Sequence, residues 1–131
     1  MKKHRLAFID VETTGLNPDK HELIQIGIVL ADQIWEGNKV TLKHIDEIEL
    51  KIKPERISDA DPQALRVNGY TPAEWIFVYS LPEAMQIFAD KPKDCIFVAH
   101  NACFDYLFID KAFRTTNIEN AMHFYKIDTL S

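Results

Sequence analysis

The hydrophobic pattern divides the chain into a first half with strand periodicity and a second half in which helices and strands alternate. Residues 6–9 are a continuous apolar run, which predicts a buried strand that continues to residue 12. Residues 23–30 and 46–53 alternate between apolar and other side chains, so each predicts a further strand. Together the three runs indicate an antiparallel meander that opens an α/β domain.

Helix signals follow residue 60. Asp61-Pro62 combines an N-cap residue with proline at the first helical position, and Gly69 is expected to end this short helix. Thr71-Pro72 repeats the same device and predicts another helix start. The remaining elements are expected at residues 81–89 (helix), 95–99 (buried strand), 104–113 (helix, with Asn101 as its N-cap) and 122–127 (strand).

Length and composition fit a single domain covering residues 1–131. No apolar run approaches the ~18–20 residues that span a bilayer, so we expect no membrane partner and a cytoplasmic location. The net charge of −5 argues against a protein that binds nucleic acid by general phosphate neutralisation. It remains compatible with an enzyme that approaches phosphates through bound cations.

Several chemically distinctive residues are expected to have structural roles. Cys95 and Cys103 form no CxxC pair, which argues against a zinc site and favours two buried free thiols. Trp35 and Trp75 are expected to pack in the core or at a hinge rather than to stack on bases. His21 has no ligand spacing to the other histidines and is expected to be a surface or strand histidine.

Asp10 and Glu12 directly follow the first apolar run. Side chains two residues apart on a strand point to the same face, with Cα atoms ~6.5–7 Å apart. Taken alone, the pair fits either a strand end that frays into solvent or a site for two divalent cations ~3.5–4 Å apart. Asp105 likewise fits two interpretations, a carboxylate that complements a helix dipole or a metal ligand.

The surrounding residues favour the metal site. The run Phe8-Ile9-Asp10-Val11-Glu12-Thr13-Thr14-Gly15-Leu16 resembles the first motif of the DEDD-type 3′–5′ exonucleases, which include the DNA polymerase III epsilon subunit and ribonuclease T. The run His100-Asn101-Ala102-Cys103-Phe104-Asp105 resembles their second motif. The family fold is ribonuclease-H-like, a mixed sheet with three antiparallel first strands flanked by helices.

The resemblance implies a two-metal mechanism with Mg²⁺ or Mn²⁺. In it, Asp10 would bridge both ions, Glu12 would hold one, and Asp105 would steady the second through coordinated water. The terminal nucleotide would be positioned by residues after the first strand and by the floor of the pocket. These nucleotide-binding residues would be Thr13, Thr14, Leu16 (as an apolar wedge), His100, Asn101 and Phe104.

Asn68 stands where many family members carry histidine in a turn that contacts the terminal nucleotide. It can keep that hydrogen bond, or it can serve only as a polar residue before the glycine of a capped turn. Both interpretations remain open from the sequence.

The family's third motif supplies a general base and a fourth carboxylate, and the 131 residues stop before it. We therefore expect a domain truncated at its C-terminus, either a fragment of a longer reading frame or a chain completed by another, and a weak or inactive enzyme when isolated. The expected partner is a single-stranded 3′ end of DNA or RNA, with a DNA polymerase as a second candidate. The alternative function is a non-catalytic module that binds nucleic acid or a polymerase through a degenerate nuclease fold.

Overall fold

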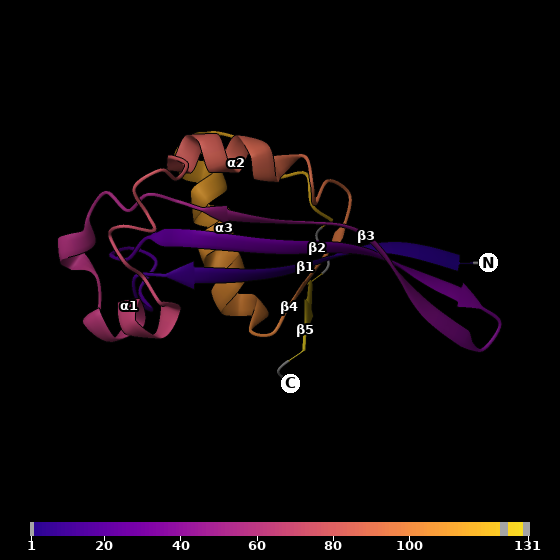
Figure 1. Cartoon of the computed structure of the whole chain (residues 1–131). Helices are drawn as coiled ribbons and strands as arrows, with labels where there is room; N and C mark the ends of the chain where they lie inside the picture. The colour runs from indigo at the N-terminus through magenta and orange to yellow at the C-terminus, as the bar shows by residue number, and fades with distance from the viewer. Residues whose placement is uncertain (1, 124–125, 130–131) are drawn as a thin grey trace.

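The structure is a computed structural model that describes residues 2–123 and 126–129. A mixed five-stranded sheet with strand order β3-β2-β1-β4-β5 forms its centre (Figure 1). The first three strands are antiparallel neighbours, while β4 and β5 run parallel to β1. The strands are β1 (Lys2–Thr13), β2 (Leu23–Glu36), β3 (Lys39–Lys51), β4 (Ile96–Ala99) and β5 (Lys126–Asp128).

Three α-helices and one short 3₁₀ helix complete the fold. They are η1 (Ile57–Asp59), α1 (Pro62–Asn68), α2 (Leu81–Ala89) and α3 (Ala102–Thr116). No helix among the described residues is long and apolar enough to cross a membrane. The order of elements confirms the predicted α/β class and the antiparallel meander at its start.

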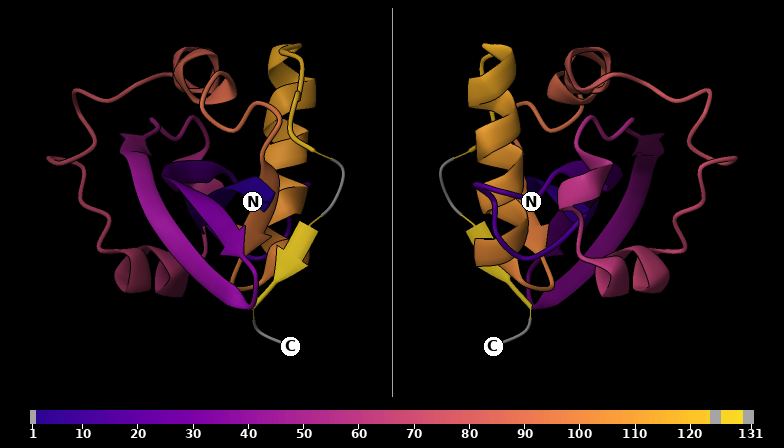
Figure 2. Two further views of the ribbon diagram at one scale, coloured as in Figure 1. Left: turned by 90° about the vertical axis from the view of Figure 1, so that its right-hand side faces the viewer. Right: turned by 90° about the vertical axis from the view of Figure 1, so that its left-hand side faces the viewer.

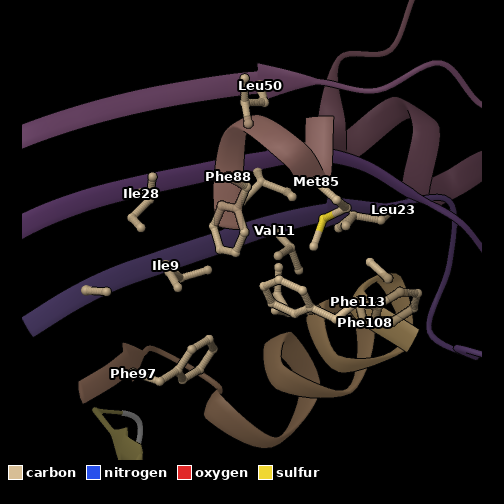
Figure 3. Close-up of a cluster of buried hydrophobic side chains, with 14 of the residues drawn as sticks. Ile9, Val11, Leu23, Ile28, Leu50, Met85, Phe88, Phe97, Phe108 and Phe113 are labelled. Carbon is tan, nitrogen blue, oxygen red and sulfur yellow. The ribbon is translucent and has the colours of Figure 1, made fainter. Parts of the chain in front are cut away.

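The core lies on one face of the sheet. Ile9 and Val11 of β1 point to this face and meet Phe88 of α2 and Phe108 and Phe113 of α3 (Figure 3). Figure 2 shows α2 and α3 side by side over this face. The alternation of β1 places its even-numbered side chains, Asp10 among them, on the opposite face.

Three of the four predicted helices are confirmed, as α1, α2 and α3, and the one expected at Thr71-Pro72 is wrong. Asp61 accepts a hydrogen bond from the Gln63 amide at the start of α1, and Gly69 ends α1 with a left-handed φ of 71°. The Thr71 hydroxyl does accept a hydrogen bond from the Glu74 amide, but residues 72–77 form turns rather than a helix. Trp75 fixes this segment against the sheet, since its buried indole donates to the Ile24 carbonyl at 3.2 Å.

The strands β2 and β3 are longer than predicted. They continue to a tight hairpin at Gly37, which has a φ of 61°, and this hairpin extends past the helices (Figure 1). The extension escaped the sequence pattern because both of its faces are largely open to solvent and no apolar alternation marks it. Trp35 lies in this hairpin with 39% of its surface exposed, so its prediction as a packed residue was wrong, while that for Trp75 is confirmed.

Two further predictions need correction. Cys95 is buried as expected, but Cys103 is exposed, because it lies on the outer side of the first turn of α3. The last strand is β5, shorter than residues 122–127 suggested, and residues 124 and 125 of that prediction lie outside the described part of the chain.

Candidate active site

Asp10 and Glu12 project from the open face of β1. Asp10 is opposite Gly27 of β2 and Glu12 is opposite Gln25. Because Gly27 has no side chain, the space over β2 beside Asp10 stays open. A cleft of about 560 Å³ covers this face, with Asp10, Gly27 and His100 among its lining residues.

Asp105 reaches the same strand from the first turn of α3. The strand β4 ends at Ala99, so the edge of β1 beyond that point has no neighbouring strand to accept its amide protons. The Asp105 carboxylate substitutes for a neighbouring strand there, because it accepts a hydrogen bond from the Val11 amide at 3.3 Å. Asp105 is only 5% exposed. A residue 94 positions away thus holds α3 against the strand that carries the other two carboxylates.

The three carboxylates interact electrostatically. Burial raises the pKa of Glu12, and the charges of Asp10 and Asp105 raise it further. Burial raises the pKa of Asp105 to about 6, aided by the charges of Asp10 and Asp128 and opposed by the hydrogen bonds from Val11 and Asn101 amides. The site therefore disfavours three negative charges held together, and a cation would relieve that repulsion.

The donor chemistry of this cluster suits a hard divalent cation, because Mg²⁺ and Mn²⁺ prefer oxygen ligands. Within the described residues, however, no three acidic, histidine or cysteine side chains are already grouped closely enough to hold an ion. The carboxylates lie near enough to repel one another, yet Asp105 is turned toward the Val11 amide. Asp10 and Glu12 are the more accessible donors.

Thr13 and Thr14 shape the loop that follows β1. The Thr13 hydroxyl donates to the Gly15 carbonyl at 2.6 Å, and the Thr14 hydroxyl accepts from the Glu22 amide at 2.8 Å. Both threonines are buried, so these hydroxyls stabilise the loop itself. Leu16 projects from the same loop and is 80% exposed.

His21 has a role that the sequence did not reveal. Its Nδ1 accepts a hydrogen bond from the Asn17 amide at 3.0 Å, and its ring packs directly over Gly15. A Cβ atom built on Gly15 would lie 2.3 Å from the His21 ring, so only glycine fits there. The prediction of a surface or strand histidine was incomplete, since His21 is half-buried and braces the loop that presents Leu16.

Asn68 also supports this loop. Its side-chain amide donates to the Thr13 carbonyl at 2.7 Å, and the Asp61 amide donates to the Thr14 carbonyl at 2.7 Å. These two bonds dock α1 onto the end of β1. In this structure the side-chain amide of Asn68, in the turn before Gly69, is thus used for a hydrogen bond within the protein.

Residues of the second motif lie partly at the cleft and partly toward the core. His100 is exposed and lines the cleft, whereas Phe104 is half-buried with its ring 5.1 Å from that of Phe108. Asn101 occupies the N-cap position of α3 as predicted, but its side chain makes no capping hydrogen bond. The residue is exposed, and the helix does not use its side-chain amide.

Comparison with known proteins places this geometry in context. The model of an exonuclease family named RNase_T matches residues 7–131. The chain is 37% identical over 122 residues to a DNA polymerase III PolC-type from Mycoplasmopsis pulmonis, covering 93% of this chain and 8% of that protein. It is 34% identical over 117 residues to the 3′-5′ exonuclease DinG of Staphylococcus aureus, covering 86% of this chain and 12% of that protein.

A solved structure shares the fold. The zinc-bound form of an Escherichia coli exonuclease I complex with single-stranded DNA superposes with a TM-score of 0.73 at 17% identity, covering 97% of this chain and 28% of that protein. The chain thus spans about a tenth of the length of the two curated relatives described above.

Proposed function

Because the chain belongs to the RNase_T exonuclease family, we propose that it is a 3′–5′ exonuclease domain acting on single-stranded DNA. One observation carries the proposal. Asp10 and Glu12 share the open face of β1, and α3 brings Asp105 to the same strand. A fold without catalytic use for these groups gains nothing from placing three carboxylates within range of mutual repulsion.

We propose that Asp10 and Glu12 hold divalent cations, Mg²⁺ or Mn²⁺, with Asp105 as the third carboxylate of the site. When bound, such ions activate water and stabilise the oxygen that leaves the cleaved phosphodiester. The protein's own contribution is positional. The Val11 amide fixes Asp105 at 3.3 Å, and the sheet fixes the spacing of the other two carboxylates.

The terminal nucleotide would lie between the cleft and the loop after β1. Leu16, exposed at the tip of that loop, would contact the base, while His100 and Asn101 would form the neighbouring wall. Thr13, Thr14 and Asn68 would act indirectly by holding the loop in place. Phe104 would support the floor through its contact with Phe108.

DNA is the proposed substrate because two relatives, a DNA polymerase and an exonuclease I complex with single-stranded DNA, are DNA enzymes by name. The match to a PolC-type DNA polymerase III favours a role beside a DNA polymerase, and the match to DinG supports the 3′–5′ exonuclease activity. A cytoplasmic location belongs to the same proposal, and cell fractionation tests it.

The expected rate is low for these 131 residues alone. The family resemblance assigns the general base and a fourth carboxylate to a third motif that this sequence does not contain. Absence of a general base typically forfeits ~10²–10⁴-fold in rate. We therefore expect slow hydrolysis, best detected with Mn²⁺ and long incubation.

The test follows a single-stranded DNA labelled at its 5′ end. We expect the unaltered chain to produce a ladder of progressively shorter strands with Mn²⁺, and Asp10→Ala to abolish it. Asp110→Ala is the matched control, since this carboxylate on α3 pairs with Arg114 at the surface and its loss should leave the ladder unchanged. Equal ladders from the Asp10 variant and the unaltered chain would refute the assignment. Equal binding of the strand by both, without hydrolysis by either, would favour a binding module.

A further inference from the structure

A three-stranded arm extends from the sheet beyond the helices (Figure 1). It is built from residues 2–5 of β1, residues 32–36 of β2 and residues 39–43 of β3. β2 pairs with β3 over the whole of this range and with β1 over residues 32–35. Helices α2 and α3 cover the sheet nearer its centre (Figure 1). Most residues of the arm are therefore exposed to solvent, although Asp32 is buried by its pairs with Lys3 and Arg5.

The strand register gives the two faces different chemistry. Paired residues on neighbouring strands point to the same side, so one face carries the ion pair of Arg5 with Asp32, together with Lys43. The other face is largely uncharged. We call it the groove face, and it consists of Lys2, His4, Gln33, Trp35, Val40 and Leu42.

The groove face is hollowed around an ordered tryptophan. Lys2, His4, Gln33, Trp35 and Gly37 line a shallow groove of about 640 Å³, and no acidic side chain of the described chain is among them. The Trp35 indole donates to the Gln33 side chain at 3.2 Å, which holds the ring in one orientation. An exposed aromatic ring held beside a lysine is the arrangement on which single-stranded bases stack.

The groove face lies on the same side of β1 as the candidate active-site cleft, with the buried side chain of Leu6 between them. Side chains at even positions of β1 share one face, so the row runs from Lys2 through Leu6 and Phe8 to Asp10. Eight residues separate the two ends, about 26 Å along the strand. A stacked strand advances about 3.4 Å per nucleotide, so about eight nucleotides would connect Asp10 to Trp35.

The charge of the groove face is compatible with nucleic acid as the occupant. Lys2 is its basic side chain, and the groove lining contains Lys2 and His4 but no acidic residue of the described chain. The other basic residues of the arm, Lys3, Arg5, Lys39 and Lys43, lie on the opposite face, where Lys3 and Arg5 pair with Asp32. The groove face is thus a weakly positive surface on a chain whose net charge is −5.

We propose that the groove face of the arm is a secondary binding site for the single strand upstream of the 3′ end, with Trp35 as its stacking platform. The proposal rests on the proposed exonuclease function for the direction of the strand. The arm binds the body of the strand, and the cleft receives its end. We therefore expect the protein to bind strands long enough to reach the arm more tightly than shorter ones.

The test measures binding without hydrolysis, so that it does not depend on the exonuclease activity. Fluorescence anisotropy with EDTA present would compare a labelled oligothymidylate of about 16 nucleotides, long enough to span the distance, with a trinucleotide. Trp35→Ala should raise the Kd for the long strand at least about five-fold and leave that for the trinucleotide unchanged. Thr41→Ala, on the opposite face of the same hairpin, should change neither.

Tryptophan emission supplies a second measurement that tolerates small losses of stability. The long strand should quench emission of the unaltered chain, because a base stacks on Trp35 while Trp75 is buried. In Trp35→Phe the quenching should disappear while binding persists. Equal Kd values for Trp35→Ala and the unaltered chain, or no binding by either, would overturn the proposal and leave the apolar groove face to a protein partner. Binding through Trp35 by a chain that never hydrolyses DNA would instead refute only the exonuclease function.

Discussion

Replacing Gly15 by alanine tests the packing that presents Leu16. The added Cβ would lie 2.3 Å from the His21 ring, well inside van der Waals contact, so the ring or the loop must move. Overpacking of this kind typically costs about 1–3 kcal/mol. Displacing His21 also removes the acceptor of the Asn17 amide hydrogen bond, at about 1 kcal/mol. We expect Gly15→Ala to lower the free energy of unfolding by about 2 kcal/mol.

A double-mutant cycle separates this clash from a general effect of glycine replacement. In His21→Ala the ring is absent, so the additional Gly15→Ala change should cost much less than it does alone. The coupling energy should be about 1 kcal/mol or more. Urea unfolding followed by the emission of buried Trp75 measures each free energy by linear extrapolation.

Gly37→Ala is the matched control. Gly37 has a φ of 61° and nothing within 4 Å of a built Cβ, so its replacement should cost about 1–2 kcal/mol through backbone strain alone. That cost should be the same with and without His21. Additivity of Gly15→Ala and His21→Ala to within about 0.5 kcal/mol would refute the packing argument.

Three further predictions concern single side chains. The Arg5 guanidinium lowers the pKa of Asp32 to about 2, so the stability from this pair should be complete above about pH 4 and be lost as the pH falls toward 2. In Asp32→Asn the free energy of unfolding, measured in acid titrations, should depend less on pH in this range. The difference from the unaltered chain should be about 1 kcal/mol, because Arg5 is partly exposed and solvent screens the pair. Asp105→Asn should keep an acceptor for the Val11 amide and nearly full stability, whereas Asp105→Ala should lose about 1–3 kcal/mol in urea unfolding, and both should impair hydrolysis. Leu16→Ala should leave the Tm unchanged, because this side chain is exposed to solvent. It should raise KM for DNA, because the apolar contact with the terminal base would be lost.

The sequence predicted the parts of the fold that repeat a simple physical signal. Alternation in residues 23–30 identified β2 because one face of that strand is buried beneath α2 and α3. The Asp61-Pro62 cap and Gly69 fixed both ends of α1. The arm carried no such signal, because most of its side chains are exposed and it is stabilised by strand pairing and the ion pairs of Asp32 rather than by an apolar face.

The candidate site was predicted as far as its motifs extend. Asp10 and Glu12 lie on one face of β1 as the two-residue spacing required, and Asp105 reaches the same strand. The partner of Asp105 could not be predicted, since the bond to Val11 depends on β4 ending at Ala99. The contact between His21 and Gly15 was equally hidden, because it depends on how the loop folds back after Pro18 rather than on residue types.

The most direct test of the central claim is a calorimetric titration of Mn²⁺ into the chain, because it reports on the carboxylate cluster without requiring turnover. Removal of both accessible donors in Asp10→Asn/Glu12→Gln should eliminate the heat of binding that the unaltered chain shows. Asp110→Asn should leave it unchanged. If the double variant binds Mn²⁺ with the same affinity and stoichiometry as the unaltered chain, the ion is not held by β1, and the assignment of this face as a metal-dependent exonuclease site is wrong.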